Sequence, residues 1–286
     1  DGLPEIIPIA RHRKDLHSPL KGHRIEVQWP LKAGLKPRTL SCNPSGTVLV
    51  VADDLRVYAG QITGKAGEEK VRFDRAPPCV ALEGQAIQDV SVACNLGRQS
   101  SCRVLVLHSE GQLLAECPLQ TSFEGQTTFA ALPHTEPEQW KIPGEWLHHK
   151  AHARKRPEQI KALAANSNCM MGTFQAKSQG CVVAGTSEGR LIELRESHIK
   201  NHTLVPERAM EHRNEALSAG SLHFSSRYVM VLRRKSHSVQ AFDTLHEKSA
   251  GEWRLPHKVN WLTLGGGGDK FFALGVDKGE IELYQF

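Results

Sequence analysis

Short apolar segments separated by polar turns recur in pairs along the chain. Each pair consists of a strand-length apolar run, a turn that contains Ser, Asp or Gly, and a second apolar run, which is the pattern of a β-hairpin. The five pairs occupy residues 48–58, 103–114, 181–194, 228–242 and 271–284. A hairpin that recurs at such intervals predicts an all-β fold of radial or stacked sheets.

Each predicted hairpin is accompanied by weaker strand signals on both sides. An upstream strand is separated from its hairpin by a turn rich in Gly, Pro, Asn or Ser. The five upstream strands are expected at residues 39–42, 89–93, 170–174, 218–224 and 259–264. A fourth, outer strand is expected at 70–73 or 79–82, at 127–131, at 203–205 and at 251–255. The first four units therefore read as four-stranded sheets.

The fifth unit lacks a fourth strand of its own. Its third strand leads directly to Phe286, so we expect the segment Gly22 to Trp29 to complete this unit. Such pairing would close the ring and remove two exposed sheet edges, which otherwise favour aggregation.

The order of strands and the turn chemistry, for example Asn43-Pro44-Ser45-Gly46 and Asp277-Lys278-Gly279, are similar to those of β-propellers. The turns near Gly189, His237 and Gly279 also follow one another at roughly the 40 to 50 residues of a four-stranded blade. The chain resembles the β-propeller superfamily, most nearly the divergent WD-repeat type, over residues 22–286. The resemblance implies a single domain of about five blades, with six as the alternative, and a partner bound at the top face or channel opening. Residues 1–21 are then an N-terminal extension.

One segment departs from the repeat, at residues 132–159 between the second and third units. It contains Trp140 and Trp146 and leads into residues 160–165, whose composition has high helical propensity. We therefore expect a partly helical insertion here. Long loops inserted into a rigid scaffold are common carriers of function.

The insertion also concentrates positive charge. Four permanent cations and three histidines lie within nine residues, beside the two tryptophans, and such a patch suits phosphate, anionic lipid or an acidic protein surface. The candidate binding residues are Trp140, Trp146, His148, His149, Lys150, His152, Arg154, Lys155 and Arg156. A solvated loop without a partner is the alternative interpretation.

Three motifs that suggest chemistry have simpler interpretations. The sequence from Gly185 to Gly189 matches the GxSxG pattern of serine hydrolases, but it falls at a hairpin turn of the repeat instead of a strand-to-helix turn. The run from Gly265 to Lys270 completes no phosphate-binding motif and falls at an inter-strand loop. His148 and His152 would share one face of a helix, but neighbouring cations would repel a metal ion. We predict no catalytic residue, no metal site and no cofactor.

Composition adds limits without naming an activity. The net charge of +5 is a mild basic excess, below that of a dedicated nucleic-acid binder. No apolar run reaches the 18 or so residues that cross a bilayer. The seven scattered cysteines form no CxxC pair, which favours reduced thiols and an intracellular protein, with a Cys94–Cys102 bridge as the exception. Because the chain starts at Asp1, a leader peptide removed by processing is also compatible with it.

The sequence favours a non-catalytic protein-interaction scaffold or a structural subunit of a larger assembly, with a protein partner. Rigid blades hold many short loops on one face and so offer a broad binding surface. The first alternative is a binder of nucleic acid or an anionic surface that acts through the basic insertion. The second is an enzyme with a site assembled from loops at the propeller face.

Overall fold

Nineteen β-strands form the regular structure of the part of the chain that the computed structural model describes. The described residues are 21–27, 38–42, 48–63, 70–73, 79–81, 83–94, 102–108, 113–119, 138–143, 158–165, 182–196, 203–210, 215–225, 228–244, 246, 248–255 and 281–285.

The first part of the chain forms a large sheet around four antiparallel strands. These are β2 (Thr39–Cys42), β3 (Val48–Ala52), β4 (Arg56–Thr63) and β5 (Lys70–Phe73), and β6 (Cys79–Val80) also pairs with β4. β5 pairs in parallel with β1 (Lys21–Val27). β1 in turn pairs antiparallel with β19 (Ile281–Gln285), from Lys21 opposite Gln285 to Ile25 opposite Ile281. The two ends of the described chain therefore share one sheet.

Three four-stranded antiparallel sheets follow in sequence order. The second sheet contains β7 (Ile87–Cys94), β8 (Cys102–His108), β9 (Leu113–Leu119) and β10 (Glu138–Lys141). The third contains β11 (Ile160–Ala165), β12 (Val182–Thr186), β13 (Leu191–Glu196) and β14 (Leu204–Met210). The fourth contains β15 (Leu222–Ser225), β16 (Tyr228–Arg233), β17 (Ser238–Asp243) and β18 (Lys248–Arg254).

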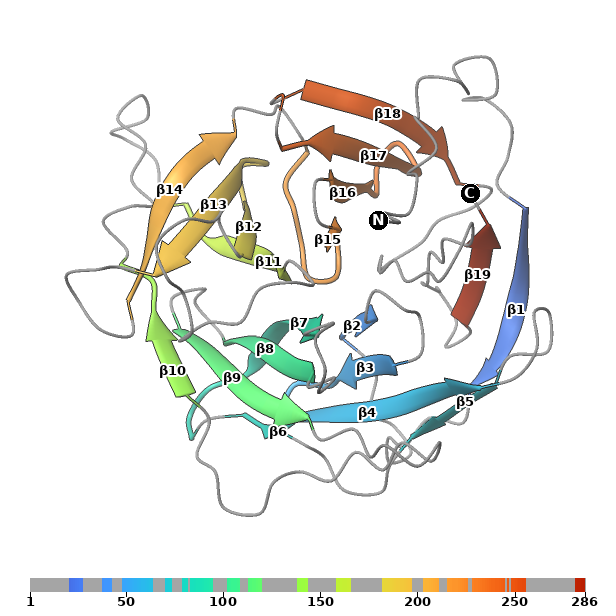
Figure 1. Cartoon of the computed structure of the whole chain (residues 1–286), viewed down its shortest axis with the longest axis horizontal. Helices are drawn as coiled ribbons and strands as arrows, with labels where there is room; N and C mark the ends of the chain where they lie inside the picture. Colours follow the sequence, from blue (N-terminus) through green and yellow to red (C-terminus); the bar gives the residue numbers. More distant parts are fainter. Residues whose placement is uncertain are drawn as a thin grey trace, which may run out of the picture.

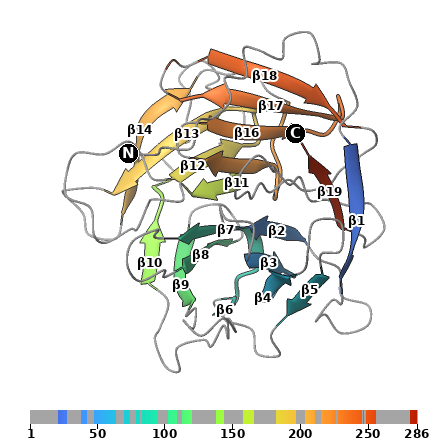
Figure 2. The same cartoon turned by 45° about the vertical axis from the view of Figure 1, so that its right-hand side comes forward.

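The sheets follow one another around a common centre, as the blades of a propeller do (Figure 1). The strands nearest the centre are β2, β7, β11 and β15, and in each sheet the three strands that follow in sequence lie progressively farther out. In the turned view β1 and β19 stay side by side at the rim, as their register requires (Figure 2). This arrangement confirms the predicted all-β fold and the resemblance to β-propellers.

The core lies between neighbouring sheets, and the alternation along β8 shows how. Val104 and Val106 join a buried cluster with residues of the large sheet, whereas Leu105 and Leu107 join one with residues of the third sheet. A third cluster lies between the third and fourth sheets. Because successive side chains of a strand point to opposite faces, a strand packed on both sides reads as an unbroken apolar run. That packing explains the Val-Leu-Val-Leu sequences from which the hairpins were predicted.

Most predicted strands fall close to their expected positions, and two departures are informative. Ile160–Ala165 was expected to be helical, and this was wrong: it is β11, paired with β12 and buried along nearly its whole length. Burial and pairing outweigh the helical propensity of its alanines, because propensity amounts to less than about 1 kcal/mol per residue. The outer strand of the second sheet is β10, inside the segment assigned to the insertion, and it pairs with β9. The strand upstream of the third hairpin was expected at 170–174, but β11 at 160–165 pairs with β12 in that position. Residues 127–131, 170–174 and 259–264 lie outside the described residues.

Candidate interaction face

Three hairpin turns define one surface of the ring, at residues 53–55, 187–190 and 234–237. Each joins the second and third strands of its sheet, counted outward from the centre. In an antiparallel sheet this turn returns to the end at which the first strand starts, so all three turns open on the same side of the ring. We call this surface the turn face.

The turn after β3 is held by the buried side chain of Asp53. Its Oδ1 accepts the backbone N–H groups of Leu55 and Arg56, both at 2.7 Å, and its Oδ2 accepts the hydroxyl of Tyr58 at 3.4 Å. This is the side-chain to backbone bonding that makes Asp favourable in turns. The tip of the turn carries Leu55, which is 61% exposed and is the one large exposed hydrophobic residue in the described part of the chain. Beside it, Arg38 and Asp54 form an exposed ion pair.

The turn after β12 is fixed by a partly buried ion pair. The Arg190 guanidinium donates from Nε to Oε2 of Glu158 at 2.8 Å and also from its Nη2, while the Thr186 hydroxyl donates to Oε1 of the same carboxylate. Glu158 is 5% exposed, and its bonds to Arg190 and Thr186 compensate for burial of its charge. Gly189 has φ +85°, a left-handed conformation that glycine adopts without steric cost.

The GxSxG motif lies in this same turn, as predicted, and its glycine and serine have structural partners. A Cβ on Gly185 would lie 2.6 Å from Cδ1 of Leu217 and 2.9 Å from Cδ1 of Leu222, so these two buried side chains would have to shift to admit one. The Ser187 N–H donates to the Gln159 carbonyl at 2.8 Å, and its Oγ accepts the Gln159 N–H at 3.2 Å. Ser187 therefore serves to join the turn to the start of β11.

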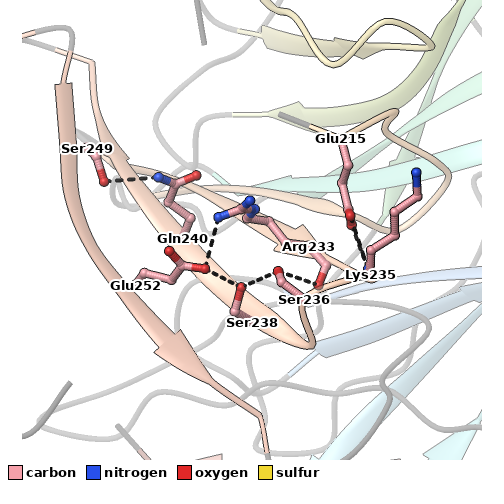
Figure 3. A network of polar contacts seen from close by, with 8 residues as sticks. All are labelled: Glu215, Arg233, Lys235, Ser236, Ser238, Gln240, Ser249 and Glu252. Atoms are coloured by element: carbon pink, nitrogen blue, oxygen red, sulfur yellow. Dashed lines mark hydrogen bonds and ion pairs between the residues drawn. The ribbon is translucent and has the colours of Figure 1, made fainter. Parts of the chain in front are cut away.

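The turn after β16 carries an exposed lysine, Lys235, on the turn face. The Lys235 N–H donates to both carboxylate oxygens of Glu215, at 3.0 and 3.1 Å, and Arg233 pairs with Glu252 at 3.0 Å (Figure 3). Ser238 donates to the same Glu252 carboxylate and hydrogen-bonds the Oγ of Ser236 at 2.7 Å. The turn is thus braced by Glu215, in the segment before β15, and by Glu252 on β18, while the Lys235 side chain stays exposed.

Near the centre, under this face, lies the buried carboxylate of Asp89. It accepts the hydroxyl of Thr39 on β2 and the backbone N–H groups of Leu163 on β11, at 2.8 Å, and of Gly220 before β15, at 2.9 Å. Desolvation by burial raises the pKa of Asp89 to about 6, and the hydrogen bonds that it accepts oppose this shift. One side chain of the second sheet therefore bonds to the three other sheets.

A second titratable group lies close to this carboxylate. Nη2 of Arg234 donates to the Ala219 carbonyl at 2.8 Å. Burial lowers the pKa of Arg234, and the negative charges of Asp89 and Glu215 act in the opposite direction. Because Asp89 is fully buried and surrounded by donors, it offers no open side to a substrate and reads as a structural anchor.

Of the predicted binding residues, only Trp140 lies in the described part of the chain. It is 1% exposed, on β10, within the cluster between the second and third sheets. Its indole packs in the core and is not presented to a partner. Trp146, His148, His149, Lys150, His152, Arg154, Lys155 and Arg156 lie outside the described residues, so the predicted basic surface stays a prediction.

The described residues also bear on two other expectations. Among them, no three or more His, Cys, Asp or Glu side chains are grouped so that they could hold a metal ion. The same residues include no helix that is long and apolar enough to cross a membrane.

The chain is similar to several solved structures at low sequence identity. One is the Swd1 (Cps50) β-propeller domain of Myceliophteria thermophila, with 12% identity, 93% of this chain and 99% of that chain covered, and a TM-score of 0.41. Another is Saccharomyces cerevisiae Sqt1, with 13% identity, coverage of 89% and 60%, and a TM-score of 0.40. A chain of a mitotic checkpoint complex is similar at 11% identity, with coverage of 91% and 75% and a TM-score of 0.43. No family model and no curated protein matches the sequence.

Proposed function

We propose that the chain is a non-catalytic interaction scaffold, a closed five-bladed propeller over residues 22–286 that binds a protein partner on its turn face. Support for closure comes from the antiparallel pairing of β1 with β19. The observation that carries the function is the turn face itself, where Leu55 stands exposed on a turn that Asp53 holds in place. An exposed apolar side chain on a preorganised turn binds with little loss of conformational entropy.

The rigidity of the sheets below supports the same proposal. The three turns are each hydrogen-bonded to the segment that enters a sheet, as in the bond from the Leu217 N–H to the Thr186 carbonyl at 3.1 Å. The Ile87 N–H likewise donates to the Asp54 carbonyl at 2.8 Å. A face built in this way presents its side chains in fixed positions without a moving part.

The test compares partner capture by matched surface variants. Lys235→Glu on the turn face and Lys248→Glu at the other end of the same sheet make the same charge change at exposed positions. We expect Lys235→Glu and Leu55→Asp to reduce capture of a cellular protein at least tenfold, while Lys248→Glu captures it as the unaltered chain does. Equal capture by all three variants would contradict the proposal.

A second candidate function is binding of nucleic acid or an anionic surface through the basic insertion. The position of Glu158, near the end of the insertion, favours this function. Arg190 and Thr186 hold Glu158 at the turn face. A partner on this face would then lie close to where the insertion rejoins the described chain. Its test is binding of single-stranded RNA and of phosphatidylserine vesicles at rising salt, with Arg154, Lys155 and Arg156 changed together to Glu. Binding that ignores both salt and charge reversal would rule this function out.

A further inference from the structure

Two cysteines of the second sheet occupy directly opposed positions. Cys94 is the last residue of β7, Cys102 is the first residue of β8, and their Cα atoms are register partners. Opposed residues of an antiparallel pair lie on the same face of the sheet. This places two thiol-bearing residues at the end of one hairpin, joined by residues 95–101.

The backbone hydrogen bonds show which kind of opposed pair this is. The N–H of Val92 donates to Oγ of Ser41 on β2 at 3.0 Å, so it points away from β8. N–H direction alternates along a strand, and the register runs without a shift from Asp89 to Cys94, so Cys94 has the same orientation as Val92. Cys94 and Cys102 therefore form a non-hydrogen-bonded pair.

This pair type brings the two residues within bonding range. Its Cα atoms lie about 4.5 Å apart, closer than in the hydrogen-bonded type. Disulfides span Cα separations of about 4.4 to 6.8 Å, so this spacing needs no movement of the backbone. A bridge here would fasten the end of β7, the strand that carries Asp89.

A third cysteine nearby supplies a control. Cys117 on β9 is the register partner of Val104, which places it diagonally from Cys102 on the same face. Diagonal neighbours are about 7 to 8 Å apart, which is beyond the reach of a disulfide. Of these three cysteines, Cys94 and Cys102 are the pair that has the required separation.

We propose that Cys94 and Cys102 are a disulfide-forming pair that a small-molecule disulfide such as oxidised glutathione oxidises. The thiolate of one cysteine attacks the glutathione disulfide, which forms a mixed disulfide and releases one glutathione thiolate. The second cysteine thiolate then attacks the protein sulfur of the mixed disulfide and releases the second glutathione. The protein loses two hydrogen atoms and one glutathione disulfide becomes two glutathione thiols.

The test is a redox titration of the full chain in glutathione buffers, with free thiols alkylated before digestion. Trypsin together with a glutamyl endopeptidase cuts after Glu83, Arg98 and Arg103, which separates Cys79, Cys94 and Cys102. We expect a peptide of residues 84–98 linked to residues 99–103, which disappears on reduction. Recovery of both cysteines in alkylated form, even in excess oxidised glutathione, would overturn the proposal.

Variants distinguish this bridge from random oxidation. Cys94→Ser should leave Cys102 as a mixed disulfide with glutathione, whereas Cys117→Ser should keep the linked peptide at an unchanged midpoint ratio. Circular dichroism confirms that each variant is folded. Linkage of Cys102 to Cys117 in the unaltered chain at the same yield would contradict the assignment.

Discussion

The carboxylate of Asp89 accepts the backbone N–H of Gly220 at 2.9 Å across 131 residues of sequence. The same carboxylate accepts the N–H of Leu163, 74 residues away, and the hydroxyl of Thr39, 50 residues away. Contacts so distant in sequence form only when the sheets have assembled around the centre. The single side chain of Asp89 thus connects β7 to β2, to β11 and to the segment before β15.

Removing this side chain should destabilise the whole ring. Asp89→Ala leaves the Thr39 hydroxyl and the N–H groups of Leu163 and Gly220 buried without their acceptor, which should cost about 3 kcal/mol or more of unfolding free energy. Asp54→Asn is the control, because Asp54 is 66% exposed and its ion pair with Arg38 is worth at most about 1 kcal/mol. Urea denaturation followed by fluorescence measures both. Equal stability of the two variants would show that Asp89 does not hold the sheets together.

The raised pKa of Asp89 predicts a particular pH dependence. Its pKa is about 6 in the folded chain and 3.8 when unperturbed, so between these values the folded state binds more protons than the unfolded state. Stability contributed by Asp89 therefore falls as pH rises from about 4 to about 6, and changes little above that. The difference in unfolding free energy between the unaltered chain and Asp89→Ala should show this fall. A difference that rises over the same interval would contradict it.

A single added methyl group at Gly185 should be costly. Ala is usually better than Gly inside a strand, by roughly 0.5–1 kcal/mol. Here the new Cβ would meet Leu217 and Leu222 at 2.6 and 2.9 Å, so we expect Gly185→Ala to destabilise the chain by about 1–3 kcal/mol. Ser187→Ala in the same motif should cost less than about 1 kcal/mol. Thermal denaturation compares the two, and a more stable Gly185→Ala variant would show that the turn packs differently.

Removal of β1 tests whether its pairing completes the fold. Deletion of residues 1–27 exposes the paired edges of β19 and β5, so we expect a lower melting temperature and a shift toward aggregates. Deletion of residues 1–20 alone keeps both pairings and should leave the melting temperature unchanged. Size-exclusion chromatography and calorimetry provide the measurements. Identical behaviour of the two deletions would mean that β1 is dispensable.

Sequence pattern predicted the hairpins well because inner strands such as β8 and β12 are apolar and buried on both faces. Thr39–Cys42 was predicted with the bounds that the structure shows, and so was Lys70–Phe73, one of two alternatives for the outer strand. The pattern failed at Ile160–Ala165, where alanines favour a helix in isolation but the partner strand β12 decides the conformation.

The central anchor could not be found from sequence in the same way. Asp89 was only the first residue of the strand predicted at 89–93, and its partners Leu163 and Gly220 come from distant parts of the chain. Likewise, nothing in the local pattern around Trp140 separates a core tryptophan from a surface one, because its burial depends on packing between two sheets.

Hydrogen–deuterium exchange of the chain with its captured partner tests most directly that the turn face is the binding surface. We expect slowed exchange in residues 53–56, 187–190 and 234–237 on complex formation, with no change at Asp243–Lys248 at the other end of the fourth sheet. Protection confined to Asp243–Lys248 or to the outer strands, with the three turns unchanged, would contradict it.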